Sequence, residues 1–427
     1  RVLMLDAGAR DTHYAGLIPP RPWQSLRQAE HDQHRYFLGD AFEGVPAGEV
    51  RVGAQLTPPR AHVGQALAEC APVAATNLRA FAGLCSLAEG GLGSAWGAGV
   101  ARFTDADLEG TGLRASDLEP HYRAVEEHIG ICGAHDDLSP HLGLHAGLMP
   151  PLALDTGSKA VLRRYLRRRA GVLGDGLALG VTRLAACSTG FTTPGGHTRG
   201  PHRLDDLDFY SDSTRAVYRP AWTLAELRER ANFTYRGGVL ARRFIERRES
   251  TGGPLVEVEY VDLATGAVQR VTARRLVLAA GVLGTARLVL ASRGRVGDAL
   301  PLVCNPYTYA PALNLNVVGE AWTDRRHSLS QLTGVYFPPA RGAVARSSAG
   351  WGAGEREPDP LHVSLYSYRS LLSFKLMKEM PLPMPAARRV ARVLQAVVCV
   401  LGIHHPAHAD PGRRVVLERA ASTDEPG

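Results

Sequence analysis

Lysine is almost missing from this chain. Only Lys159, Lys375 and Lys378 are lysines, so 46 of the 49 basic residues are arginines. With abundant alanine and glycine, this bias is typical of a GC-rich coding sequence. The 42 acidic residues are interspersed among the basic ones, and no recognition motif or aromatic-basic platform accompanies the net charge of +7. We expect no nucleic-acid partner, and we interpret the dense basic stretch at residues 163–169 as the solvated face of a helix.

Cysteine is sparse and long hydrophobic runs are missing. The six cysteines stand singly, without a CxxC or His-Cys cluster, which predicts no metal site and implies no disulfide framework. Reduced thiols and a cytoplasmic location are the expectation, although a lost N-terminal signal would leave no trace here. The longest apolar run, residues 390–403, includes Arg392 and Gln395 and is too short for a transmembrane segment. It predicts a buried or amphipathic helix, with interfacial attachment as the alternative.

The most informative motif begins with the five apolar residues 276–280. Gly281 and Gly284 follow, and a helical pattern starts near Thr285. We interpret this as a buried strand that turns sharply into a helix. The glycines let the backbone approach a ligand, and free N–H groups at a helix start favour anionic or polar groups. An ordinary strand-to-helix turn is the alternative.

The first residues form a second buried strand pattern that ends in Asp6, with Gly8 two residues later. In a dinucleotide-binding fold, a carboxylate at the tip of the second strand accepts hydrogen bonds from the ribose hydroxyls. Asp6 fits that role, with a solvated loop carboxylate as the alternative. The glycine fingerprint that cradles the pyrophosphate belongs roughly 20 residues earlier, and only five residues precede Asp6. Together with the missing initiator Met, this favours a truncated chain over loss of the cradle.

A glycine-rich loop stands at residues 87–100. Five glycines in ten residues surround Trp96, and linkers rarely carry a large aromatic side chain with apolar neighbours. Such a loop can wrap a flat ligand, with Ser94 as a polar contact. A packed surface loop is the alternative.

Periodicity predicts the main elements. A helix over 117–130 is expected, capped by Ser116, and three strands joined by turn-forming residues form a β-meander. A Pro-rich break at 381–385 precedes the apolar helix. Expected strands are residues 177–184, 240–247, 255–262, 268–273, 312–318 and 362–368, and expected helices are 160–170, 222–231 and 369–379.

In order and spacing, these segments resemble the glucose-methanol-choline (GMC) family of FAD-dependent oxidoreductases. The matching segments are residues 2–8, 90–97, 117–122, 237–239 and 278–288. The resemblance implies an α/β protein with a doubly wound, Rossmann-like FAD-binding domain that contains the meander, and an α+β substrate-binding domain. The expected boundaries are residues 1–130 and 232–295 for the first domain and 131–231 and 296–427 for the second.

The resemblance also implies which residues hold FAD. Asp6 resembles the family's acidic ribose ligand, Val239 the residue whose backbone contacts adenine, and Ala280 and Gly281 the turn beside the adenosine half. Ser94 stands where the family often has Asn in the loop along the flavin. The full implied set is Asp6, Gly8, Gly90, Gly91, Ser94, Trp96, Gly97, Val239, Ala280 and Gly281.

The family's C-terminal catalytic segment has no counterpart. Alcohol oxidation needs a base beside the hydride-accepting nitrogen of the flavin, and His404 and His405 stand in a context unlike the catalytic motif. The catalytic residue is therefore unassigned. The prediction is a GMC-type flavoprotein that oxidises the CH–OH group of a small-molecule alcohol, in a truncated or inactive form. The alternatives are a catalytically impaired binding or scaffold relative and an NAD(P)-dependent dehydrogenase.

Overall fold

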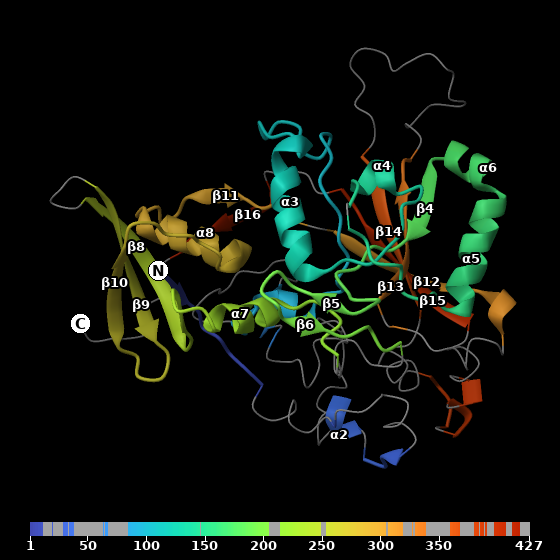
Figure 1. Ribbon diagram of the computed structural model, residues 1–427, viewed down its shortest axis with the longest axis horizontal. Helices are drawn as coiled ribbons and strands as arrows, with labels where there is room; N and C mark the ends of the chain where they lie inside the picture. Colours follow the sequence, from blue (N-terminus) through green and yellow to red (C-terminus); the bar gives the residue numbers. More distant parts are fainter. Residues whose placement is uncertain are drawn as a thin grey trace.

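The computed structural model describes residues 1–11, 19, 29–32, 34–37, 63, 65–66, 84–145, 147–204, 214–248, 253–304, 306–318, 327, 329–338, 359–367, 380–383, 385–387, 389–390, 397–406 and 412–418. It is a mixed α/β structure with several separate sheets. Along its long axis, a three-stranded sheet lies at one end and a five-stranded sheet toward the other, with α3 (Ala115–Ile129) between them (Figure 1).

The predicted β-meander is confirmed. Strands β8 (Val239–Arg248), β9 (Pro254–Asp262) and β10 (Val268–Ala273) pair antiparallel in that order. Each boundary lies within one residue of the expected one, because turn-forming residues separate strands that carry clear alternation. Glu259 in the middle strand binds Arg243 at 3.1 Å and Arg270 at 3.0 Å, so ion pairs join all three strands.

Helix α8 (Gly281–Ser292) packs along β8. Nη2 of Arg287 donates to the carbonyl of Ala241 at 2.5 Å, and the Ser292 hydroxyl accepts the N–H of Phe244 at 2.8 Å. The second half of the helix therefore contacts the strand at Ala241 and Phe244. The helix begins four residues before the expected Thr285.

The expected buried strand over residues 276–280 is wrong. The structure assigns no strand there, and Val277 is 86% exposed. An apolar run becomes a strand only where a neighbour takes its backbone hydrogen bonds. Within the described residues the only parallel strand pair is β1 (Val2–Leu5) with β7 (Phe233–Arg236), so a doubly wound sheet is not formed by these residues.

The five-stranded sheet draws on distant parts of the chain. Its order is β12–β15–β14–β13–β4, and every neighbouring pair is antiparallel. The strands are β4 (Leu177–Val181), β12 (Tyr307–Leu313), β13 (Ser330–Tyr336), β14 (Leu361–Ser367) and β15 (Val398–His404). Two helices, α5 (Thr156–Arg167) and α6 (Arg169–Gly174), lie beside β4 (Figure 1).

Several expectations in this region need correction. The helix expected over the apolar run 390–403 is wrong at Val398–His404, which forms β15. A short apolar run does not distinguish a buried strand from a helix. The strand expected at 312–318 ends at Leu313, and Leu315–Val317 is the 3₁₀ helix η4. The strand at 362–368 is confirmed as β14, whereas the helix at 369–379 lies outside the described residues.

The helices expected earlier in the chain exist with shifted ends. Helix α3 begins at Ala115, so Ser116 lies inside it, and Asp117 instead accepts the N–H of the N-cap residue Arg114 at 2.9 Å. The helix expected at 160–170 begins at Thr156, and Arg168 separates α5 from α6. Helix α7 (Pro220–Arg228) starts two residues early because proline suits the first helical turn.

A buried core joins these parts. Irregular segments from 96–100, 129–132, 148–152, 184–187 and 217–218 contribute Ala98, Cys132, Leu184, Ala186 and their neighbours. Single bridges between Gly99 and Leu184 and between Cys132 and Leu184 hold these segments together. The remaining elements are α2 (His34–Phe37), β2 (Gln65–Ala66), β3 (Leu84–Cys85), η3 (Gly91–Ala95), α4 (Ser139–Leu142), β5 (Phe191–Thr192), β6 (Thr198–Arg199), β11 (Ala299–Pro301) and β16 (Arg414–Val416).

Cysteine chemistry differs in part from the expectation. Cys132, Cys187, Cys304 and Cys399 form no disulfide. Cys85 is disulfide-bonded, so the expectation that every cysteine is a reduced thiol is wrong for this residue. Spacing could not show this, because a disulfide depends on the spatial approach of two side chains. In the described part of the chain, no helix combines the length and the apolar character needed to cross a bilayer.

Candidate nucleotide-binding site

Asp6 lies directly after β1, where three segments meet. Its N–H donates to the carbonyl of Arg236 at 3.0 Å, and its carbonyl accepts the N–H of Val239 at 3.0 Å. Oδ2 of Asp6 accepts a 3.0 Å hydrogen bond from the hydroxyl of Tyr235. Burial raises the pKa of Asp6, and the Tyr235 hydrogen bond partly opposes that rise. The carboxylate is therefore half-buried and oriented rather than a solvated loop group.

Gly8 is required by the close approach of Tyr235. Its φ of +61° lies in the left-handed region, and a Cβ there would come within 2.5 Å of the Tyr235 hydroxyl. Only glycine satisfies both conditions without moving the tyrosine. Gly8 thus leaves room for the Tyr235 hydroxyl to reach the Asp6 carboxylate.

Val239 opens β8 beside Asp6. Its side chain is 2% exposed, and its N–H is committed to the Asp6 carbonyl. The predicted contact with adenine therefore cannot use this N–H. The structure does bring Val239 and Asp6 together, although 233 positions separate them in the sequence.

The glycine-rich loop reaches the same place. Ala9 and Ala88 form a parallel bridge, and the N–H of Glu89 donates to the carbonyl of Ala9 at 3.0 Å. Oε2 of Glu89 accepts hydrogen bonds from Nη2 of Arg10 at 2.5 Å and Nη2 of Arg228 at 2.9 Å. This loop is therefore tied to the end of β1 by backbone bonds and by two ion pairs.

Ser94 and Trp96 are used inside the protein. The Ser94 hydroxyl donates to the carbonyl of Glu89 at 2.9 Å, which closes the turn around η3. The Trp96 indole N–H donates to the carbonyl of Tyr218 at 2.8 Å, and its ring meets the Tyr218 ring edge-on at 6.5 Å. These contacts shape the loop, and a direct contact of either side chain with a ligand stays a prediction.

The loop glycines divide into packed and open positions. A Cβ at Gly90 would lie 2.5 Å from Oγ of Ser94, so the space beside this glycine is already occupied by the protein. At Gly91 and Gly97, a Cβ would meet no atom within 4 Å. The backbone is accordingly open to a ligand at Gly91 and Gly97 and closed at Gly90.

Ala280 and Gly281 form the start of α8. Ala280 is the N-cap residue and makes no side-chain cap, the first turn holds no acidic residue, and Gly281 has a φ of +72° with open space where a Cβ would stand. The first N–H groups of a helix lack intrahelical acceptors and favour an anion. Helix α8 packs on β8, the strand that begins at Val239.

Sequence reasoning missed the side chains that hold the site together. Arg228 stacks its guanidinium on the ring of Tyr235, with 4.1 Å from the carbon to the ring centroid, and joins it to Glu89. The available signals were slight. Glu89 immediately precedes the Gly90–Gly91 pair, and Tyr235 stands two residues before Gly237, where a Cβ would lie 2.9 Å from the tyrosine ring.

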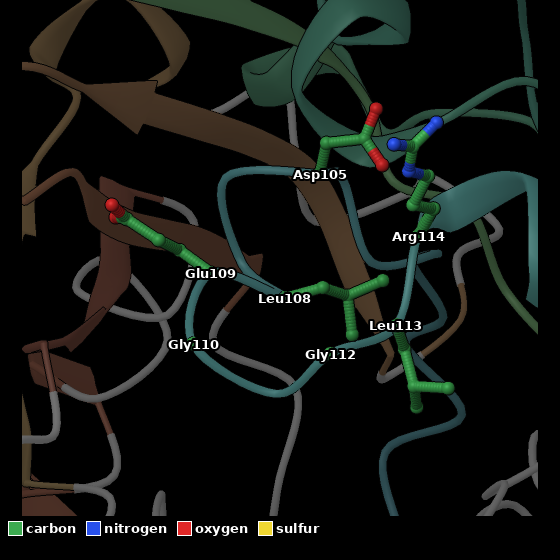
Figure 2. Close-up of a pocket in the computed structure, with 7 residues that line it drawn as sticks. All are labelled: Asp105, Leu108, Glu109, Gly110, Gly112, Leu113 and Arg114. Atoms are coloured by element: carbon green, nitrogen blue, oxygen red, sulfur yellow. The ribbon is translucent and has the colours of Figure 1, made fainter.

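A pocket of about 420 Å³ lies elsewhere, in the loop before α3, where Asp105 and Arg114 lie on one side and Glu109 on the other (Figure 2). Oδ1 of Asp105 accepts the N–H of Ala115 at 2.8 Å and so serves the helix start. None of the predicted FAD-binding residues lines this pocket.

His404 lies in β15 among aromatic side chains. It stands opposite Tyr307 of β12 and His362 of β14, and its ring centroid is 4.3 Å from that of Tyr307. Burial lowers the pKa of both His362 and His404. His405 points to the other face, where Nε2 lies 2.9 Å from Oγ1 of Thr308. The structure therefore separates the two adjacent histidines, and the catalytic base stays unassigned.

Comparisons with known proteins add no family. No model of a known protein family matches the chain, and no curated protein matches its sequence. The resemblance to the GMC family accordingly rests on the sequence motifs alone.

Proposed function

We propose that the chain is an FAD-dependent oxidoreductase of the GMC type, which oxidises the CH–OH group of a small-molecule alcohol. The observation that supports this most directly is the meeting of Asp6, the loop at Glu89–Gly91 and Val239 around the end of β1. These three segments come from distant parts of the sequence. A dinucleotide site of the Rossmann type needs a ribose-binding carboxylate at such a strand end.

The residues present fit an FAD molecule in three ways. Asp6 offers an oriented carboxylate to the ribose hydroxyls, Gly91 and Gly97 leave backbone open, and the uncapped start of α8 at Gly281 offers N–H groups to anionic or polar groups. Bound FAD would supply the hydride acceptor for alcohol oxidation. Ser94 and Trp96 would hold the loop in shape.

The proposal includes two domains with the expected boundaries. Strand β4 lies in one sheet with β12–β15, which supports grouping residues 131–231 with 296–427 as the substrate-binding part. β1 pairs with β7, and β7 leads into the meander, which supports grouping residues 1–130 with 232–295 as the FAD-binding part. A cytoplasmic location stays a prediction, and the disulfide of Cys85 does not support it.

Flavin binding tests the proposal directly. The purified protein should show visible flavin absorption or should quench the fluorescence of added FAD. Asp6→Ala should weaken FAD binding by about 10- to 100-fold, since hydrogen bonds to a charged group contribute about 1.5–3 kcal/mol. Asp175→Ala, an exposed carboxylate at the end of α6, is the matched control and should bind FAD like the parent.

The same titration separates the alternatives. A colourless protein that takes up no FAD would remove the proposed function. Tight NADPH binding without flavin would select an NAD(P)-dependent dehydrogenase instead. Circular dichroism of both variants checks that lost binding does not report unfolding.

A further inference from the structure

Helix α5 and its junction with α6 carry a basic face that the proposed function does not use. Lys159, Arg163, Arg164, Arg167 and Arg168 are all exposed. Within the described residues, none of their side chains forms an ion pair or a hydrogen bond. We call these five residues the α5 basic face.

The next residue shows what an ordinary surface arginine does here. Arg169 binds Asp137 with two hydrogen bonds, from Nε at 2.7 Å and from Nη2 at 2.5 Å. Among the described residues, the α5 basic face has no such partner, although it lies on the neighbouring turns. Its charges are therefore left for solvent or for a ligand.

The spacing of these charges works against the helix. Lys159, Arg163 and Arg167 follow one another at intervals of four residues, and Arg164 and Arg168 form a further pair. Like charges at this spacing repel and destabilise a helix. The helix dipole favours cations only in the last turn, so it does not account for Lys159 and Arg163.

An exposed apolar side chain borders the face beside Lys159. Leu166 is 57% exposed, whereas Ser158 and Tyr165 on the opposite side of α5 are buried. Those buried residues face the five-stranded sheet, and α5 with α6 lies at the end of the molecule remote from the meander (Figure 1). The basic face with Leu166 is thus turned outward.

We propose that the α5 basic face docks on the surface of an anionic phospholipid bilayer. Arginine guanidinium groups match phosphate geometry, and an apolar side chain among basic residues enters the boundary between headgroups and acyl chains. A nucleic acid fits less well, because no aromatic, Asn or Gln side chain accompanies the charges at the surface of α5. This inference does not depend on the proposed oxidoreductase function.

Vesicle co-sedimentation tests the docking. The full chain should bind vesicles that contain phosphatidylserine, should bind pure phosphatidylcholine vesicles far more weakly, and should be released by high salt. Arg163→Gln/Arg167→Gln should lower binding about 25-fold, since each basic residue near an anionic surface contributes about fivefold. Leu166→Ser should also weaken binding, with the charges intact.

The matched control is Arg242→Gln/Arg248→Gln, which removes two exposed arginines from β8 and changes the net charge equally. This variant should bind vesicles like the parent. Equal losses in both double variants, or equal binding to neutral vesicles, would overturn the proposal. Tighter binding of a DNA duplex than of anionic vesicles, unchanged by Leu166→Ser, would also overturn it and would indicate a nucleic-acid surface.

Loss of folding does not confuse this test. Arg163→Gln/Arg167→Gln removes two like-charge pairs from exposed positions, so the thermal midpoint should be unchanged or higher. Arg164→Gln/Arg168→Gln is an independent second variant and should show a similar loss of vesicle binding.

Discussion

The guanidinium of Arg102 donates two hydrogen bonds to the carboxylate of Glu126, from Nε at 2.7 Å and from Nη2 at 2.8 Å. Arg102 is 6% exposed, and its remaining Nη1 binds Glu119 at 2.5 Å. Nδ1 of His145 lies 2.7 Å from the same Glu126. One helix, α3, thereby anchors two loop segments through a single, largely covered carboxylate.

We predict that Glu126→Ala destabilises the protein by about 3 kcal/mol, because removing one partner of a buried pair leaves the other charge uncompensated. Glu119→Ala should cost far less, since its carboxylate is exposed and such pairs contribute little. Urea unfolding of both variants measures the difference. Equal losses would show that Arg102 is compensated in another way.

Acid should destabilise the protein through His145. Burial lowers the pKa of His145 below its usual 6.5, against the opposing effect of Glu126. The folded state therefore prefers the neutral imidazole. The stability that neutral His145 contributes is fully present above pH 6.5, the unfolded pKa, and is lost as the pH falls through the lower folded pKa. Unfolding free energies measured from pH 8 to pH 5 should fall less steeply for His145→Asn than for the parent. A parallel pH profile would contradict this.

Gly180 of β4 is predicted to tolerate no side chain. A Cβ there would collide with the carboxylate of Asp136, which accepts the N–H of Val181 at 2.8 Å. We expect Gly180→Ala to cost about 1–3 kcal/mol, as in other overpacked sites. Gly171→Ala in α6 meets no atom within 4 Å and should be neutral or stabilising. Thermal unfolding of both variants decides between them.

Tyr235→Phe should cost about 0.5–1.5 kcal/mol through the lost hydrogen bond to Asp6. It should also raise the pKa of Asp6 further, because that hydrogen bond lowers it. When the folded pKa of a carboxyl lies above its unfolded value, the protein loses the stability contributed by that group as the pH rises through the folded pKa. The fall in unfolding free energy that Asp6 causes as the pH rises should therefore extend to higher pH in Tyr235→Phe. The same fall should vanish in Asp6→Asn. Urea unfolding between pH 3 and pH 7 measures both.

The meander could be predicted from the sequence because local signals agree there. Alternating side chains define β8, β9 and β10, and glycine-containing turns separate them. β15 could not, since Val398–His404 carries no period that distinguishes a strand from a helix. The strand prediction for residues 276–280 was wrong for a different reason. A strand there needs a neighbouring strand, which the apolar run itself does not specify.

The candidate site shows the same division. Asp6 and the glycines stand out because their residue types are constrained by backbone geometry and by the chemistry of a ribose ligand. Tyr235, Arg228 and Glu89 carry no motif, and their contacts join positions up to 229 residues apart. Side-chain pairs of this kind become visible only in three dimensions.

The sheet that contains β4 has a consequence for synthesis. Val181 pairs with Leu332, so about 150 residues must leave the ribosome before β4 meets its partner. At roughly 5–20 residues per second, this strand waits on the order of ten to thirty seconds. The meander, whose strands are contiguous, closes during that interval. A nascent-chain pulse experiment should therefore find the meander protected from proteases before the edge at Leu177–Val181 is covered.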